Sequence, residues 1–201
     1  MNSASPAAVI AATLALSACV STGERPTPAA NSTQQAASLA PSPAPIDLPC
    51  IQTTHGCTAI NPDVTQANIR QTICVSGYTR TVRPATAYTN GVKAKLMSEA
   101  GLDSSRMSDY ELDHIIPLAV GGHPRKLSNL QLQPWYGQNS ALEKDGLERR
   151  LQHMVCKGRI SLIDAQHCIA ENWQACETDI AAGRIPSGGR VITQSVSGAT
   201  Q

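Results

Sequence analysis

The sequence contains no phenylalanine and few other aromatic residues. Four Tyr and two Trp complete the aromatic content, which is 3% of the 201 residues. Large aromatic rings supply much of the buried surface in most protein cores. A core in this chain must therefore be built from aliphatic side chains, and we expect it to need further support.

Long hydrophobic runs are also absent from the sequence. The most apolar stretch, within residues 1–18, is too short to cross a bilayer and has the length of the apolar region of a signal peptide. It ends in Leu16-Ser17-Ala18-Cys19, which resembles a lipobox and implies cleavage before Cys19 and lipidation of that residue. No Lys or Arg precedes the run, which departs from the usual pattern. The alternative is a plain secretory signal peptide with an incidental cysteine.

Composition also sets the expected domain boundaries. Residues 19–48 are dominated by Pro, Ala, Ser, Thr and Gln and show no periodic apolar pattern. Such a segment cannot bury a core, so we predict a disordered tether. We place one folded domain at 49–181 and predict a disordered tail at 182–201, where Gly, Ser and Thr return.

The net charge of the whole chain is only +1 and excludes no class of partner. Between residues 70 and 160, however, 13 Lys or Arg stand against 8 Asp or Glu. This balance suits binding to a phosphate backbone, although a solvated basic surface is the simpler interpretation. The candidate nucleic-acid-binding residues are Arg80, Arg83, Lys93 and Lys95.

The six cysteines after the lipobox form no CxxC pair, and the chain has no HxxxH pair. These absences weigh against a zinc site and favour disulfides in an exported protein. Cys168 and Cys176 are eight residues apart, or about 12 Å along a continuous helix. Bridged Cα atoms lie within about 7 Å, so these two can pair only if the helix ends between them. We prefer a bridge between Cys74 and Cys156, and the other pairings stay open.

Local patterns predict several further elements. Residues 72–84 indicate an extended segment, and residues 85–100 indicate a helix that a glycine ends. A second helix is expected over 140–156, again with a glycine after it. A third helix should begin after Ser161, where the sequence resembles a capping box.

The stretch from Tyr110 to Asp145 organises the rest of the chain. Residues 110–116 and 129–133 read as two short strands, and Gly and Pro residues turn the chain between them. A helical pattern then starts near Asn139. An Asp-His pair, a middle Asn and a later Asn are thereby brought into one strand-loop-strand-helix unit.

This unit resembles the HNH-type endonucleases, which are ββα-metal nucleases, and in particular the small exported or membrane-anchored members from bacteria. The resemblance covers roughly residues 57–175. It implies an α+β fold with a ββα-metal core, additional packing helices and disulfide support. Asn139 stands where many members have His, although variants with Asn there occur in the family.

The chemistry of phosphodiester hydrolysis assigns a role to each residue. His114 is the candidate general base, because a neutral imidazole can take a proton from water at physiological pH. Asp113 and Asn139 offer oxygen ligands that suit Mg²⁺ or Mn²⁺ better than Zn²⁺. Asn129 resembles the family's middle Asn, which braces the loop that carries the base.

Two observations temper these assignments. Adjacent residues on a regular strand point to opposite faces, so Asp113 and His114 share a site only if the strand ends or bends there. Each residue taken singly could also have an ordinary structural role. Lys144 and Asp145, for example, are as consistent with a solvated helix face as with a functional role. The joint pattern is what favours the nuclease interpretation.

We therefore predict a metal-dependent endonuclease that hydrolyses DNA, with RNA as a further candidate substrate. No base-reading module is apparent, so cleavage should be largely independent of sequence. The protein should be exported and held by lipid on the periplasmic or cell-surface side of a membrane, and no protein partner is predicted. The alternatives are a non-catalytic nucleic-acid-binding lipoprotein and a structural lipoprotein of the envelope.

Overall fold

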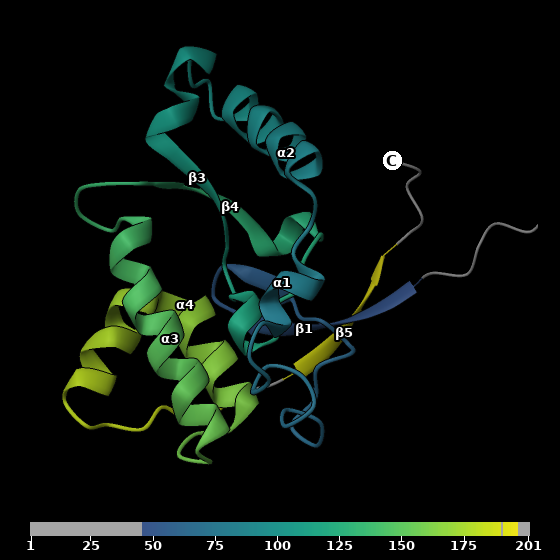
Figure 1. Cartoon of the computed structure of the whole chain (residues 1–201), viewed down its shortest axis with the longest axis vertical. Helices are drawn as coiled ribbons and strands as arrows, with labels where there is room; N and C mark the ends of the chain where they lie inside the picture. Colours follow the sequence, from purple (N-terminus) through teal and green to yellow (C-terminus); the bar gives the residue numbers. More distant parts are fainter. Residues whose placement is uncertain (1–45, 190, 197–201) are drawn as a thin grey trace, which may run out of the picture. The chain divides into compact units, whose positions relative to one another are not determined.

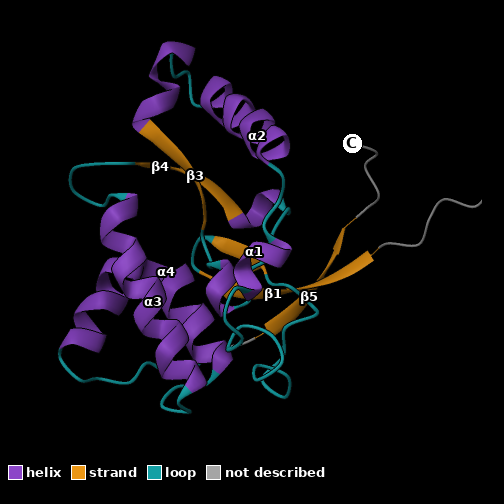
Figure 2. Ribbon diagram, in the orientation of Figure 1, coloured by secondary structure: helices purple, strands orange, loops and turns teal. Residues whose placement is uncertain are grey.

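The computed structural model describes residues 46–189 and 191–196. The predicted signal peptide, Cys19 and all but the end of the predicted tether lie outside the described residues. The fold class is α+β, with two small antiparallel sheets and several helices (Figure 2). Within the described residues, no helix is long and apolar enough to cross a membrane.

The first sheet joins the two ends of the described chain. Its strand order is β2-β1-β5, where β1 is Ile46–Thr53, β2 is Gly56–Ala59 and β5 is Val191–Val196. β1 and β5 run antiparallel and lie side by side (Figure 1). The boundaries predicted at residues 48 and 182 therefore need correction, because both flanking segments contribute a strand. The β-branched sequence VITQSV is the strand signal that the Gly and Ser content around it obscured.

The segment that follows this sheet differs from its prediction. Residues 72–84 were expected to be extended, but they form turns and the short helix α1, Tyr78–Val82. Gly77 precedes the helix with φ 83°, a left-handed conformation that glycine adopts without strain. The β-branched threonines favour a strand locally, and the tertiary setting of this segment overrides that preference.

The predicted helix over 85–100 is present as α2, Thr86–Glu99. Gly101 follows with φ 65°, in the left-handed position that ends many helices. The helix buries Val92 and Met97. A 3₁₀ turn, η1, Ser104–Asp109, then leads into the second sheet.

The second sheet is the predicted hairpin. β3, Tyr110–His114, pairs antiparallel with β4, Leu130–Pro134, with His114 opposite Leu130. The loop between them contains two 3₁₀ turns, η2, Leu118–Val120, and η3, Leu127–Asn129.

Helix α3, Ala141–Cys156, follows the hairpin directly and ends before Gly158, which has φ 69°. Ser140 caps it, because the Ser140 hydroxyl accepts a hydrogen bond from the Glu143 amide at 3.4 Å. The helix buries an apolar face that includes Leu147, Leu151, Met154 and Val155.

Helix α4, Leu162–Ala181, begins with the expected cap, in which the Ser161 hydroxyl accepts from the Asp164 amide at 3.1 Å. The helix breaks at Asn172, whose φ of −164° and ψ of 99° are not helical. The Asn172 side chain then caps the second half by accepting from the Ala175 amide at 2.9 Å. This break brings the Cα atoms of Cys168 and Cys176 to 5.3 Å, and the two are bridged.

Two further disulfides support the fold. Cys74 is joined to Cys156, the pairing preferred from the sequence, and this ties the segment before α1 to the last residue of α3. Cys50 is joined to Cys57 across the β1–β2 turn. Three disulfides are compatible with an exported protein. They supplement an aliphatic core that includes Ile51, Ile73, Ile116, Val120, Leu147, Leu151, Val155 and Ile169.

Candidate functional site

A cleft of about 580 Å³ lies where β3, α3 and the segment around α1 meet. β3 and α3 contribute most of the ionisable groups along its wall, and Arg83 faces them from the end of α1. The ionisable side chains that line the cleft include Arg83, Glu111, Asp113, His114, Asp145, Glu148 and Arg149. The predicted base therefore lies in a cavity large enough for a substrate group.

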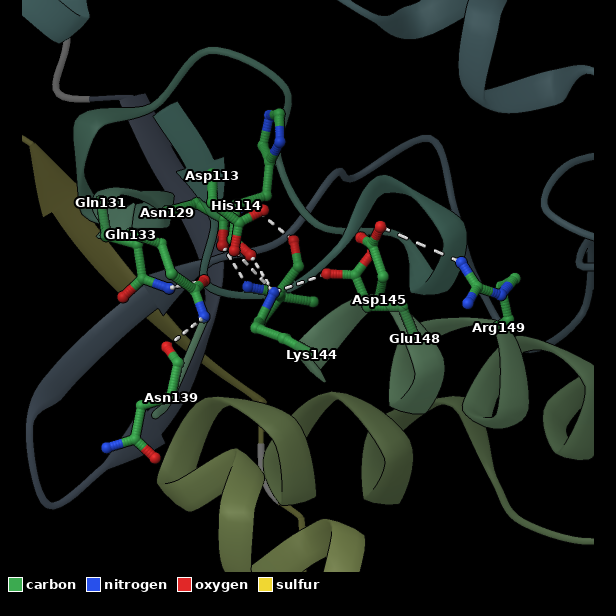
Figure 3. Close-up of polar contacts among 11 residues, drawn as sticks. Asp113, His114, Asn129, Gln131, Gln133, Asn139, Lys144, Asp145, Glu148 and Arg149 are labelled. Carbon is green, nitrogen blue, oxygen red and sulfur yellow. Dashed lines mark hydrogen bonds and ion pairs between the residues drawn. The ribbon is translucent and has the colours of Figure 1, made fainter. Parts of the chain in front are cut away.

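Asp113 and His114 both line this cleft, although they are neighbours on β3. Both residues are paired with β4 inside β3, where neighbouring side chains point to opposite faces of the sheet. The Ile115 amide donates a hydrogen bond of 3.0 Å to the main-chain oxygen of Asn129, which holds the chain at the strand end. Asp113 and His114 therefore border the same cleft, but their side chains are directed differently, because the Asp113 carboxylate binds Lys144 and the His114 ring points away from that lysine (Figure 3).

His114 is 6% exposed, and its ring has a defined partner. Nε2 lies 3.2 Å from the main-chain oxygen of Pro124. A carbonyl oxygen only accepts hydrogen bonds, so this contact places the proton on Nε2 and leaves Nδ1 as the acceptor. Burial lowers the pKa of His114, and the positive charges of Arg83 and Lys144 act in the same direction. The contact to Pro124 and the charge of Asp113 oppose them. The ring is therefore neutral at physiological pH.

Asn129 is fully buried and binds the loop that follows His114. Its side-chain oxygen accepts from the Ile116 amide at 2.8 Å, and its side-chain nitrogen donates to the main-chain oxygens of Ile116 and His123, each at 3.0 Å. Gly122 makes this packing possible, because a Cβ there would lie 1.7 Å from the Ile116 oxygen. These are the contacts of a residue that braces the loop.

Lys144 is not on a solvated helix face, as the sequence allowed, but is 1% exposed. Its Nζ donates to Asp113 Oδ2 at 2.9 Å, to Glu148 Oε1 at 2.6 Å and to the main-chain oxygen of His114 at 2.8 Å (Figure 3). The ammonium has three donors, and all three are used. The side chain thus links α3 to the end of β3.

The pKa values around Lys144 reflect its burial and its partners. Burial by itself lowers the pKa of Lys144, but the carboxylates of Asp113 and Glu148 outweigh it, and the pKa is raised. Burial raises the pKa of Glu148 to about 7, although Lys144 opposes this shift. Burial likewise raises the pKa of Glu111, with the charge of Asp113 acting in the same direction. The negative charge of Glu148 is therefore reduced at neutral pH.

Asn139 does not join Asp113 in the structure. It is exposed, has φ 64° and does not line the cleft. Its main-chain oxygen accepts from Gln133 Nε2 at 3.1 Å, its amide donates to Glu143 at 2.8 Å, and its side chain points away from Asp113 and Lys144 (Figure 3).

The predicted metal-ligand pair is thus not assembled, and Lys144 already engages the carboxylate of Asp113. Among the residues that the structure describes, no cluster of three or more His, Cys, Asp or Glu could hold a metal ion. The residues present therefore do not fit the divalent cation that the resemblance implies.

The predicted nucleic-acid-binding residues fall into two groups. Arg83 is exposed and lines both the cleft and a smaller adjoining pocket, which Lys93 also lines. Arg80 and Lys95 line neither, and Lys95 forms an ion pair with Glu99 on the exposed face of α2. Only Arg83 and Lys93 are thus placed near His114.

Sequence reasoning missed the contribution of α3 to the cleft. Asp145, Glu148 and Arg149 all line it, and Asp145 lies 4.0 Å from Arg149 (Figure 3). Their spacing of three and four residues puts them on one face of a helix, next to the buried apolar face. That spacing could have shown from the sequence that the three side chains lie on one face of the helix. It does not show that this face lies against β3.

The chain was compared with protein-family models, with curated proteins and with solved structures, and none of the three comparisons finds a match. The assignment of a function consequently depends on the residues of the cleft themselves.

Proposed function

We propose that this chain is a phosphodiester hydrolase that cuts DNA, with β3, β4 and α3 as a ββα nuclease core. The observation that carries the proposal is the state of His114. His114 is neutral, its contact with Pro124 holds the proton on Nε2 and leaves Nδ1 as the basic atom, and the residue lines a cleft that also contains cationic groups. Asn129 supports it, because it fixes the loop through which the chain leaves the histidine.

The chemistry assigned to this arrangement is in-line hydrolysis. His114 Nδ1 takes a proton from a water molecule, the water oxygen bonds to phosphorus, and the bond to the leaving oxygen breaks. Glu148 lines the same cleft, and its pKa of about 7 leaves part of its carboxyl protonated, so it can supply the proton that the leaving oxygen takes. None of these steps uses the predicted Mg²⁺ or Mn²⁺, because Asp113 and Asn139 do not come together.

Phosphate binding is assigned to the arginines at the cleft. Arg83 and Arg149 are exposed and approach it from α1 and α3 respectively. Guanidinium groups bind phosphate oxygens without reading the bases, so binding should be largely independent of sequence and should weaken steeply with salt. Lys93 extends this basic surface along the adjoining pocket.

We place this activity outside the cytoplasm. Three disulfides suit an oxidising compartment, and the lipobox-like Leu16-Ser17-Ala18-Cys19 suggests a lipid anchor on an envelope membrane. DNA, and RNA as a second candidate, would then be met at the periplasmic or cell-surface side.

Incubation of the purified chain with supercoiled plasmid tests the proposal. Conversion to nicked and linear forms, with an initial rate that falls as salt rises, is the expected result. A mobility shift of the plasmid without any nicking would instead identify a non-catalytic DNA-binding protein. The absence of both would leave an envelope protein that does not bind nucleic acid. A parallel incubation with single-stranded RNA tests the second substrate.

A further inference from the structure

Lys144 buries a charged ammonium group against the main chain of the residue proposed as the base. The group has three oxygen partners within 2.9 Å, which are Asp113 Oδ2, Glu148 Oε1 and the main-chain oxygen of His114. The side chain is 1% exposed, and those of Asp113 and Glu148 are 15% and 19% exposed. A buried charge of this kind persists only because it is paired and hydrogen-bonded.

The three partners make a distinctive set. Two carboxylate oxygens and one carbonyl oxygen are the ligand types that hard divalent cations take in proteins. Asp113 is also the residue for which the sequence predicted a metal-binding role. In the structure the position between these oxygens is filled by Lys144 Nζ, whose charge is held by both carboxylates.

Two cations cannot share this position. A divalent ion bound to Asp113 Oδ2 would lie a few ångströms from the ammonium, where like charges in a partly buried site repel strongly. Either the ammonium or the ion can satisfy Asp113, Glu148 and the His114 oxygen at one time. The chain carries the ammonium on a helix that the Cys74–Cys156 bridge and a buried apolar face hold in place.

We propose that Lys144 is the built-in cation of this centre, and that it takes the position for which the resemblance implies a divalent ion. The proposal rests on the function proposed for His114. Lys144 acts as a positioning residue, because it fixes the Asp113 carboxylate and the His114 main chain, not the substrate. A divalent cation is then not needed to order the site.

The direct test measures Mn²⁺ binding to the purified full chain without DNA, and electron paramagnetic resonance monitors the binding. The wild-type chain and the control Lys157→Met, an exposed lysine just after α3, should bind Mn²⁺ weakly and equally. Lys144→Met removes the charge and nearly preserves the length. It should bind one Mn²⁺ at least about tenfold more tightly, because two carboxylates are left facing an empty position. Adding Glu148→Gln to that variant should abolish the gain.

Plasmid nicking in EDTA separates this proposal from the proposed function. The wild-type chain should nick at the same rate with Mg²⁺ and with EDTA, whereas Lys144→Met should lose nicking in EDTA and regain it with Mn²⁺. That rescue is a result that a purely structural role would not give.

The proposal would be overturned if the wild-type chain bound Mn²⁺ tightly and Asp113→Asn removed that binding. This test does not depend on the folding of a lysine variant. Nicking that needs Mg²⁺ would also overturn it while leaving the nuclease function intact. If no variant nicks but Mn²⁺ binding follows the predicted pattern, the nuclease function fails and the role of Lys144 stands.

Discussion

His114 Nε2, at the end of β3, lies 3.2 Å from the main-chain oxygen of Pro124, ten residues further along the chain. Because the carbonyl can only accept, the contact selects one neutral tautomer of the ring. Burial acts on the same group by lowering its pKa below the ordinary value of 6.5. The contact with Pro124 thus decides which ring nitrogen can accept a proton, and burial of the ring decides the pH range in which the histidine is neutral.

The lowered pKa predicts the pH dependence of cleavage. The neutral fraction of a histidine grows as pH rises through its pKa, so a lowered pKa moves this limb of the profile to more acidic pH. We expect the plasmid nicking rate to reach half its maximum on the acidic side at a pH below 6.5. The measurement is the initial rate over a buffer series at constant ionic strength. A midpoint above 6.5 would contradict the burial argument.

Asn129→Ala should destabilise the fold through the loop, because it leaves the amide and carbonyl of Ile116 without their partner. Unsatisfied buried polar groups cost about 1–3 kcal/mol each, so we expect these two groups to lower the free energy of unfolding by at least about 2 kcal/mol. Urea denaturation measures it. The exposed Asn90→Ala on α2 is the control and should change stability by less than about 0.5 kcal/mol. Equal stability of the two variants would show that the brace is not needed.

The disulfides should contribute unequally to stability. Cys74–Cys156 closes a loop with a sequence separation of 82, and Cys168–Cys176 one of only 8. Loop-closure entropy predicts a stabilisation of about 4.5 kcal/mol for the first and about 2.5 kcal/mol for the second. Chemical denaturation of the Cys74→Ser/Cys156→Ser and Cys168→Ser/Cys176→Ser variants compares them. A larger loss from the second pair would indicate that native-state packing, and not chain entropy, decides the difference.

The lipid anchor predicted at the N-terminus is tested by fractionation of producing cells. Cys19→Ala removes the thiol that the lipobox-like sequence would lipidate, so the protein should move from the membrane fraction to the soluble fraction. Ser21→Ala, two residues further on, is the control and should stay with the membrane. Membrane association of Cys19→Ala equal to that of wild type would show that the lipobox interpretation is wrong.

The hairpin and the helices of the central unit could be predicted because their signals are local. Apolar and polar residues alternate in the sequence LQLQ of β4, Ser140 and Ser161 cap the helices that follow them, and Gly101 and Gly158 end two helices. Each of these features depends on residues a few positions apart. The same locality misled the prediction for residues 72–84, where threonines favour a strand but the fold places α1.

The centre of the site could not be predicted, because its contacts join distant residues. Lys144 and Asp113 are 31 positions apart, and nothing in the spacing of charges on α3 says that this lysine turns inward. The exposed position of Asn139 likewise depends on the loop between β4 and α3. The residue types in the sequence indicated the candidate chemistry. The packing of α3 against β3 decides which side chains lie together in the site.

The most direct test of the proposed function is plasmid nicking by His114→Ala, measured beside DNA binding. Loss of a general base should slow cleavage by about 10²- to 10⁴-fold, while binding, which depends on the arginines, should be retained. His55→Ala, an exposed histidine that does not line the cleft, should nick at the wild-type rate. An undiminished nicking rate in His114→Ala would contradict the central claim that this histidine activates the attacking water.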